Sequence, residues 1–336
     1  MKAIVINQFG GSEVLEVVSG HPAPSPGPRQ VLVAIQAAGI NPLDWKIREG
    51  QLRLLLGARF PIVLGHDVSG VVTAVGHEVT RFGPGDEVFG MLDGAPEPSR
   101  TGLARGGGYA EMAVTREDTL ARKPQSLSHA QAASVPLAAL TAYQVLCRKA
   151  AMRPGHEVLI NGASGGTGIF AVQIAKALGG VVTAVCSAGN HERVAGLGAD
   201  RLVDYRRQAI TDLGHRFDII YDAAAAASFA QCRPRLKTSG VFISNLPSAS
   251  GMLSKMTAPL VRFLGGRPQN DFAWVKPAGE DLETIRQMID AGRLRTVIDR
   301  TYAPEAIRAA HDYSQSGRVR GKLVIDFRPS ERAAAT

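Results

Sequence analysis

A glycine-rich run, residues 161–168, is the stretch whose residue types and spacing point most directly to a bound ligand. It reads Asn-Gly-Ala-Ser-Gly-Gly-Thr-Gly and joins a short β-branched run, residues 158–160, to a segment with apolar residues at helical spacing. A strand that turns directly into a helix leaves unpaired N–H groups, and these groups and the helix dipole attract a pyrophosphate. The residues expected to bind the pyrophosphate of a dinucleotide are Ser164, Gly165, Gly166, Thr167 and Gly168. A tight turn with no ligand is the alternative.

The end of the next apolar run, residues 181–185, should select the dinucleotide. NAD sites usually place an Asp or Glu at this strand end, where the carboxylate binds the ribose 2′-hydroxyl. Here the chain continues Cys-Ser-Ala-Gly-Asn-His-Glu-Arg, so no carboxylate follows directly and Glu192 lies further on. Ser187 and Asn190 can donate hydrogen bonds to a 2′-phosphate, and basic residues follow them. We therefore expect NADPH, although Ser and Asn are also good helix caps.

Five apolar runs alternate with helical segments in this half of the chain and predict one doubly wound parallel sheet. The runs are residues 158–160, 181–185, 199–205, 217–223 and 240–246. Ligands bind outside the carboxyl ends of such strands. Leu246 ends the fifth run, so we expect it to border the nicotinamide or the substrate. A last strand is predicted at 272–276.

The first part of the chain reads as strands and turns. Short apolar or β-branched runs alternate there with turns, and the proline-rich stretch 22–28 suits neither a helix nor a central strand. Asn41 and Lys46 follow the long run that ends near residue 38, in a short predicted helix and the turn before it. Because they place polar groups near a strand end, they are the candidates for catalysis.

Length, charge and cysteine content limit the classes of function. The 336 residues are enough for two domains, and no apolar run reaches the length of a membrane span. The net charge of +8 is not gathered in a dense basic run, so nucleic acid is not expected as a main partner. Three scattered cysteines and an N-terminus without the features of a signal peptide favour the cytoplasm.

The order of several motifs resembles the medium-chain dehydrogenase/reductase superfamily, and most of all its zinc-free quinone oxidoreductase branch. The motifs are Gly-Ile-Asn-Pro-x-Asp at 39–44, Gly-His-Asp-x-x-Gly-x-Val at 65–72, Gly-Pro-Gly-Asp-x-Val at 83–88 and the glycine turn. Residues 41–46 are similar to alkenal/alkenone and chloroplast-envelope-type quinone oxidoreductases. The resemblance implies an α/β fold, with a GroES-like, mainly β catalytic domain and a Rossmann domain built on a doubly wound parallel sheet.

The resemblance also implies where the domains begin and end. The catalytic domain would comprise residues 1–126 and 277–327, and the Rossmann NADPH-binding domain residues 127–276. Residues 328–336 would form a frayed tail. In relatives the strand expected at 272–276 often pairs across a dimer, so a homodimer is expected.

No metal is expected at the catalytic site. Zinc alcohol dehydrogenases have a cysteine at the position of Asn41 and another near Leu137, so His66 alone keeps a ligand residue. A catalytic zinc ion needs three protein ligands. The cysteine cluster of the structural zinc lobe is also absent, because residues 92–108 contain no cysteine.

Further roles are implied by the resemblance alone. Thr141 often points at the nicotinamide in relatives, and the tyrosine at position 205 commonly lies along the adenosine and reaches the 2′-phosphate. Lys46 and Asn41 are the candidates for stabilising a developing oxyanion, and related alkenal reductases have a lysine at the place of Lys46. The charge of Lys46 would point either toward the carbonyl oxygen of the substrate or toward the cofactor phosphate. Core packing is the alternative for Thr141, and a solvated surface position is the alternative for Lys46.

These features predict a zinc-independent, NADPH-dependent oxidoreductase. Without a Lewis acid, acceptors with their own electron sink suit it best, namely quinones and the C=C bond of α,β-unsaturated carbonyls (alkenals and alkenones). Two alternatives stay open: an enoyl-thioester reductase of the same superfamily, and a non-catalytic NADPH-binding protein associated with RNA.

Overall fold

The computed structural model describes residues 1–56, 59–93, 106–247, 250–254, 256–257 and 269–328. The chain folds into two compact units, the first made of Met1–Leu140 and Lys276–Thr336 and the second of Thr141–Val275. The predicted tail lies outside the described residues except for Arg328. Within the described ranges, no helix has the length and apolar character needed to cross a bilayer.

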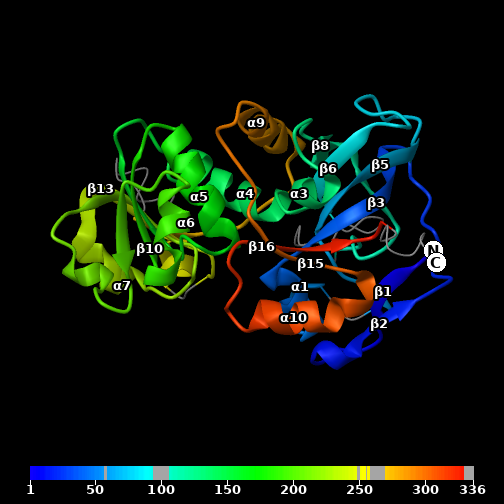
Figure 1. The fold of residues 1–336 in the computed structure, drawn as a ribbon, viewed down its shortest axis with the longest axis horizontal. Coiled ribbons are helices and arrows are strands. Elements are labelled where there is room, and N and C mark those ends of the chain that lie inside the picture. Colours follow the sequence, from blue (N-terminus) through cyan, green and yellow to red (C-terminus); the bar gives the residue numbers. More distant parts are fainter. Residues whose placement is uncertain (57–58, 94–105, 248–249, 255, 258–268, 329–336) are drawn as a thin grey trace. The chain divides into compact units, whose positions relative to one another are not determined.

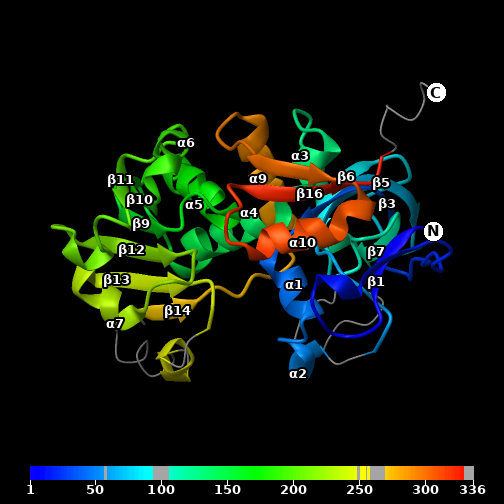
Figure 2. The same cartoon turned by 60° about the horizontal axis from the view of Figure 1, so that its bottom comes forward.

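The second unit is built on one parallel sheet of six strands. In spatial order they are β11 (Arg201–Asp204), β10 (Val181–Cys186), β9 (Glu157–Asn161), β12 (Phe217–Asp222), β13 (Leu236–Ser244) and β14 (Asn270–Phe272). Figure 2 shows these strands side by side in this order. The chain starts at β9, moves outward through β10 and β11, and then returns to the other side of β9. The strand order therefore reverses between β9 and β12.

The helices of this unit follow the same plan. The helix α5 (Gly166–Ala177) begins inside the glycine run and packs on β9 and β10, as the spacing of its apolar residues predicts. Figures 1 and 2 show α5 and α6 (His191–Ala195) on the same side of the sheet. Other helical segments in this unit include the π-helix Gln144–Lys149, the 3₁₀ turns Ala188–Asn190, Ile210–Asp212 and Arg233–Arg235, α7 (Phe229–Cys232), and the helical residues 250–254 and 256–257.

The first unit contains a larger and a smaller sheet. The larger runs β15 (Ile298–Tyr302), β16 (Lys322–Asp326), β3 (Gln30–Ile40), β5 (Asp67–Val75), β6 (Glu87–Met91) and β8 (Leu120–Arg122), with β7 (Met112–Arg116) also paired to β3. The smaller is β2 (Leu15–Val18), β1 (Ala3–Ile6) and β4 (Ile62–Val63). Because β16 pairs antiparallel with β3, the C-terminal part of the chain returns to the first unit.

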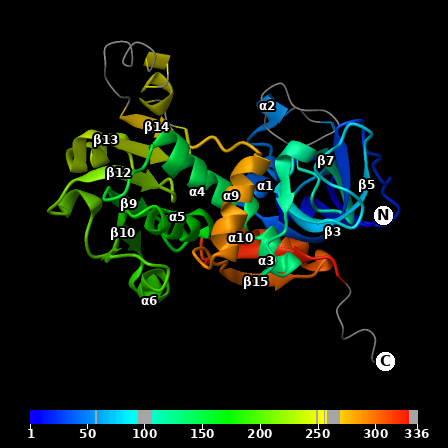
Figure 3. The ribbon, with the colours of Figure 1, turned by 90° about the horizontal axis from the view of Figure 1, so that it is seen from above.

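Short helices complete the first unit. The helix α1 (Pro42–Arg48) follows β3 directly, and α3 (His129–Ala133) packs against β3, β5 and β16 (Figure 3). The remaining helices of this part of the described chain are α2 (Arg53–Leu56), α9 (Gly279–Asp290) and α10 (Ile307–Gln315). The division between the units falls inside α4 (Pro136–Tyr143), later than the boundary at 127 expected from the sequence, because α3 packs on the sheet of the first unit.

The predicted last strand of the parallel sheet differs from the structure in its bounds. The strand predicted at 272–276 lies at Asn270–Phe272, since its partners in β13 are Phe242 to Ser244. In the first unit, Ala110 forms an isolated bridge with Ala3, and β7 begins at Met112.

Candidate functional site

The glycine turn after β9 has the geometry of an anion cradle. Gly165 is the N-cap of α5, and no side chain caps the helix. A Cβ atom added to Gly165 would have only the Gly162 carbonyl oxygen nearby, at 3.4 Å, so the space in front of it is open. A Cβ atom on Gly168 would lie 2.1 Å from that same oxygen, so this glycine lets the helix approach the turn. The residues present therefore fit a pyrophosphate at the α5 N-terminus.

A buried pair of polar side chains lies at the point where the strand order reverses. Asn161, the last residue of β9, donates from Nδ2 to Oδ1 of Asp222, the last residue of β12, at 2.8 Å. The fully buried Asp222 also accepts from the backbone N–H of Ala227 at 2.9 Å. This pair was not predicted as part of the site. A carboxylate at the end of an otherwise apolar strand was the available signal, and it was read only as a strand residue.

The carboxyl end of β13 presents Leu246. Tyr221 in β12 donates its hydroxyl to Asn245 Oδ1 at 2.6 Å, and Asn245 Nδ2 donates to the carbonyl of Ala223 at 2.8 Å. These bonds fix the backbone just before Leu246, which is 46% exposed. An apolar side chain held at this edge is consistent with the predicted place beside the nicotinamide, which stays a prediction.

The residues predicted to select the dinucleotide lie at the ends of two paired strands. Cys186 of β10 and Asp204 of β11 are register partners, so Ser187 and Tyr205 follow at neighbouring strand ends. Tyr205 is 57% exposed, and the guanidinium carbon of Arg206 lies over its ring, 5.7 Å from the ring centre. An exposed ring with a cation on it suits an adenosine phosphate.

Asn190 is hydrogen-bonded to Ser187. It is buried and donates from Nδ2 to the Ser187 hydroxyl oxygen at 3.0 Å. The Ser187 hydroxyl accepts this bond, which leaves its own hydrogen for a ligand. Asn190 therefore positions the donor Ser187, and its own predicted hydrogen bond to the 2′-phosphate stays a prediction. Thr141, in α4, is the first residue of the second unit and is buried, and its predicted contact with nicotinamide stays untested.

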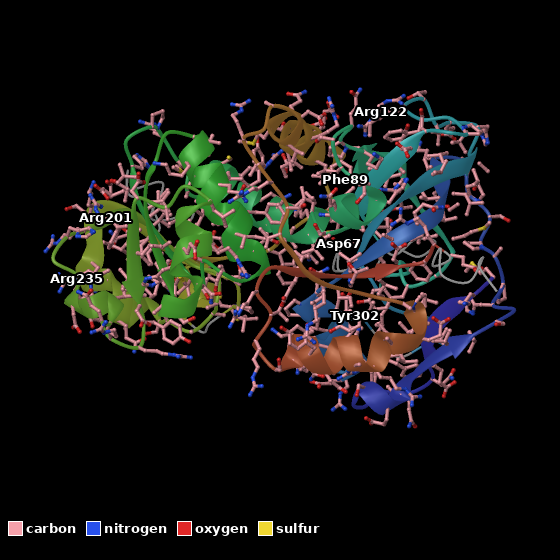
Figure 4. The ribbon with its side chains drawn as sticks, in the orientation of Figure 1. Asp67, Phe89, Arg122, Arg201, Arg235 and Tyr302 are labelled. Carbon is pink, nitrogen blue, oxygen red and sulfur yellow. The ribbon has the colours of Figure 1, made fainter. Side chains whose placement is uncertain are left out.

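In the first unit, Asn41 lies in a buried polar cluster. Its side chain donates from Nδ2 to Asp67 Oδ2 at 2.9 Å, and its Oδ1 accepts from the ammonium of Lys322. Lys322 also lies 3.3 Å from Asp67 Oδ2, and the backbone N–H of Leu137 donates to Asp67 Oδ1 at 2.7 Å. Asp67 begins β5, and Figure 4 shows it close to β16. The side-chain nitrogen and the side-chain oxygen of Asn41 are therefore both hydrogen-bonded to protein groups.

A second set of buried groups surrounds Asp44 in α1. Oδ1 of Asp44 lies 2.7 Å from His66 Nδ1, and Oδ2 accepts from the Tyr109 hydroxyl at 3.0 Å and from the Asn41 backbone N–H at 2.8 Å. Burial opposes ionisation of Asp44, but the hydrogen bond and charge of His66 outweigh it and lower the pKa of the carboxyl. Burial and the charge of Asp44 raise the pKa of Tyr109. Tyr109 is thus a structural donor, and His66 is held by Asp44.

Lys46, the predicted catalytic lysine, sits on the same helix. It is partly buried, with its ammonium 5.5 Å from the centre of the Trp45 ring. Burial lowers the pKa of the ammonium, and no charged group among the described residues contributes to the shift. A desolvated cation with no carboxylate to neutralise it is suited to stabilise a developing negative charge.

At the two positions where zinc alcohol dehydrogenases have cysteine ligands, this chain has groups that are already hydrogen-bonded within the protein. The described residues contain no group of three or more His, Cys, Asp or Glu side chains able to hold an ion. The Asn41 amide is bonded at both ends, and the Leu137 backbone N–H is bonded to Asp67. The ammonium of Lys322 already supplies the positive charge beside Asp67.

His311 in α10 is buried beside Arg48, and its ionisation should make stability depend on pH. Arg48 Nη1 lies 3.3 Å from His311 Nδ1, so Nδ1 must be the acceptor and the ring must be neutral. Burial lowers the pKa of His311 from 6.5 to about 4. The unfolded chain therefore binds the proton first as the pH falls, and stability should be lost progressively from about pH 6.5 to pH 4, by about 3 kcal/mol in all.

The measurement is the free energy of unfolding in urea across this pH window. His311→Gln keeps an acceptor for Arg48 but does not titrate, so its stability should vary less with pH than that of the wild type. His77→Gln, at an exposed site, should keep the wild-type slope. A His311→Gln variant with the wild-type slope would contradict the assignment.

Comparisons with known proteins give one consistent result. A family model described as alcohol dehydrogenase GroES-like domain matches residues 27–125, and one described as zinc-binding dehydrogenase matches residues 197–325. The chain is 33% identical over 336 residues to the chloroplast envelope quinone oxidoreductase homolog of Arabidopsis thaliana, covering 97% of this chain and 98% of that protein.

An enone reductase and a solved structure are similar as well. The 2-methylene-furan-3-one reductase of Solanum lycopersicum is 33% identical over 329 residues, which cover 97% of this chain and 79% of that protein. The structure of the quinone oxidoreductase from Coxiella burnetii has a TM-score of 0.83 at 30% identity and covers 98% of this chain and 99% of that one.

Proposed function

The chain belongs to the quinone oxidoreductase branch of the medium-chain dehydrogenase/reductase superfamily, and from this premise we propose that it is a zinc-independent, NADPH-dependent reductase of quinones and α,β-unsaturated carbonyls. The single observation that carries the proposal is the open cradle at Gly165, in front of an α5 N-terminus with no side-chain cap. The similarity to a quinone oxidoreductase homolog and to a 2-methylene-furan-3-one reductase supports this acceptor class.

The preference for NADPH rests on the ends of β10 and β11. Ser187 has a hydroxyl hydrogen left to donate, and Tyr205 and Arg206 form an exposed stack at the neighbouring strand end. Cys186 ends β10, where NAD sites have a carboxylate. The carboxylate of Asp204 accepts a hydrogen bond from the backbone N–H of Arg206 at 3.0 Å. This set of groups suits a 2′-phosphate better than a 2′-hydroxyl.

The chemistry follows from the cofactor and the acceptor. When bound, NADPH supplies a hydride from C4 of its nicotinamide and leaves as NADP⁺. For an enone, the hydride and its electron pair form a new C–H bond at the β-carbon, the C=C π pair moves onto the carbonyl as an enolate, and a solvent proton completes the reduction at the α-carbon. Lys46 is the candidate for stabilising the enolate oxygen, because its ammonium is partly desolvated and no charged group in the described part of the chain contributes to its lowered pKa.

The test is the oxidation of NADPH and of NADH, followed by absorbance, with a short alkenal, an alkenone, a benzoquinone and a crotonyl thioester as acceptors. The proposal expects NADPH to be oxidised faster than NADH, with the enones or the quinone as the better acceptors. Preferred turnover of the thioester would favour an enoyl-thioester reductase instead. NADPH binding without turnover of any acceptor, accompanied by salt-sensitive RNA binding, would favour a non-catalytic protein.

Removal of metal ions should leave the activity unchanged. The proposal places no metal in the reaction, since Lys322 provides the charge beside Asp67. Dialysis against a strong zinc chelator, followed by assay in chelator-treated buffer, is therefore expected to preserve kcat and KM. A zinc-dependent alcohol dehydrogenase treated in parallel is the control, and it should lose its activity. Loss of activity here that returns on adding Zn²⁺ would refute zinc independence.

A homodimer in the cytoplasm completes the proposal. The strand β14 is at the edge of the parallel sheet, so a second copy can extend the sheet by pairing along it. Sedimentation equilibrium of the wild type should give twice the chain mass. Asn270→Pro should weaken the association, because residues 269 and 273 bond to β13 and the backbone N–H of Asn270 therefore faces the open edge. A wild-type monomer at micromolar concentration would argue against this pairing.

A further inference from the structure

Three buried side chains from distant parts of the chain, Lys322, Asn41 and Asp67, form a compact cluster that we call the lysine cluster. The Lys322 ammonium donates to Asn41 Oδ1 and lies 3.3 Å from Asp67 Oδ2, and Asn41 Nδ2 donates to the same Asp67 oxygen at 2.9 Å. Lys322 is 3% exposed, Asn41 2% and Asp67 0%. The cluster is therefore cut off from water, and its members satisfy one another.

The lysine cluster fixes the start of α1. Asn41 is the residue immediately before the helix, and its backbone N–H donates to the carboxylate of Asp44 in the first turn. Through Asn41, the helix start is tied to β5 by Asp67 and to β16 by Lys322. The helix then carries Lys46. The orientation of Lys46 thus depends on contacts made before the helix begins.

The positive charge of Lys322 has no substitute in the cluster. Burial raises the pKa of Asp67, and the charge of Lys322 is the first influence that opposes this rise. The Asp67 carboxylate also accepts hydrogen bonds from the Asn41 amide and the Leu137 backbone N–H, both of which are neutral. A buried carboxylate that loses its cation is strongly unfavourable. Without Lys322, Asp67 and Asn41 would have to rearrange or admit water.

We propose that Lys322 is a positioning residue for the reductase reaction: its ammonium takes the place of a metal ion as the cation bound by Asn41 and Asp67, and it thereby sets the orientation of α1 and of Lys46. This inference rests on the proposed function, in which Lys46 stabilises the oxyanion. The sequence offered Asn41 as a catalytic group, whereas the engaged amide makes it the link between Lys322 and the helix that carries Lys46.

Two variants separate positioning from a loss of fold. Lys322→Arg keeps the cation but changes its shape. The double variant Lys322→Met, Asp67→Asn removes both charges together, so it leaves no unpaired buried carboxylate and keeps an acceptor for the Leu137 N–H. Lys176→Met is the matched control, because its ammonium binds Asp200 at 2.8 Å on the other unit and near the surface.

The first readout is steady-state kinetics with an enone, together with NADPH affinity by calorimetry. The double variant should lose roughly tenfold to a hundredfold in kcat/KM, a cost typical of misplaced reacting groups, and NADPH affinity should stay at the wild-type value. Lys322→Arg should recover part of the loss, and Lys176→Met should match the wild type. A double variant that is folded by circular dichroism and has wild-type kcat/KM would overturn the proposal.

The second readout does not depend on activity. Reductive methylation with ¹³C-formaldehyde labels the lysines, and the Lys46 resonance is assigned by its loss in Lys46→Arg. In the double variant, the pKa of the Lys46 ammonium, measured by NMR titration, should rise toward the ordinary lysine value. The reason is that a displaced α1 exposes this ammonium to water. An unchanged Lys46 titration would overturn the proposal even if the rate fell. If the wild type reduces no acceptor, the proposed function fails, while the titration still decides the role of Lys322 in setting α1.

Discussion

Gly165→Ala is expected to remain folded and yet to lose at least about tenfold in NADPH affinity, which is about 1.4 kcal/mol of binding free energy. The backbone at Gly165 is extended, with φ −82°, so alanine is tolerated there. The added Cβ would meet only the Gly162 oxygen, at 3.4 Å, and would occupy the open space where the pyrophosphate is proposed to lie. The stability change should be within about 1 kcal/mol, because glycine and alanine differ modestly as N-caps.

Gly168→Ala is the matched comparison, and the opposite result is expected for it. A Cβ atom at this position would lie 2.1 Å from the Gly162 carbonyl oxygen and 2.8 Å from the α-carbon of Ala163. The turn and the helix must separate to relieve this overlap, so the protein should be destabilised by about 1–3 kcal/mol. Urea unfolding and calorimetric titration with NADPH measure both variants. Wild-type NADPH affinity in Gly165→Ala would remove the main support for the cofactor site.

Lys46→Met is expected to lower kcat/KM for an enone by roughly a hundredfold to a thousandfold, the usual cost of removing one group that stabilises an oxyanion. Lys46→Arg should keep part of the activity, because it keeps the charge but not the shape. NADPH affinity should not change in either variant, since the predicted cofactor residues belong to the second unit. Lys2→Met, which removes a surface ammonium paired with Glu305, is the control.

The lowered pKa of Lys46 also predicts that enone reduction is lost at alkaline pH. Burial lowers the pKa of the Lys46 ammonium below its ordinary value of 10.5. Activity that needs the charged form is therefore present below this lowered pKa and is lost as the pH rises through it. This alkaline limb of the pH profile should disappear in Lys46→Met and move to higher pH in Lys46→Arg. A limb unchanged in both variants would assign the titration to another group.

The cofactor half of the site was largely predictable from the sequence, because its signals are local. A strand, a glycine turn and a helix follow one another within residues 157–177, and the helix begins at Gly166, inside the glycine run. The same holds for Ser187 and Tyr205, which are marked by where their strands end. The hydrogen bond from Asn190 Nδ2 to the Ser187 hydroxyl oxygen was not predictable in this way, because the two groups meet only when the turn has folded.

The catalytic half was harder to predict, because its polar residues act in groups. Asn41 and Lys46 were found from their place after a strand, but the sequence reads Lys322 only as one of three basic residues near the C-terminus. Asp222 and His311 carried no distinctive spacing. Their roles depend on burial and on partners, neither of which a linear pattern contains.

By itself, the sequence determined the succession of strands and helices, the dinucleotide turn and the family. Each depends on residues that are close in the chain, where periodicity and turn chemistry act. Only the tertiary structure decided which polar side chains are buried together. Lys322 and Asn41 are 281 positions apart and meet because β16 pairs with β3. That pairing removes water from the Asp67 carboxylate, and a buried carboxylate requires a cation beside it.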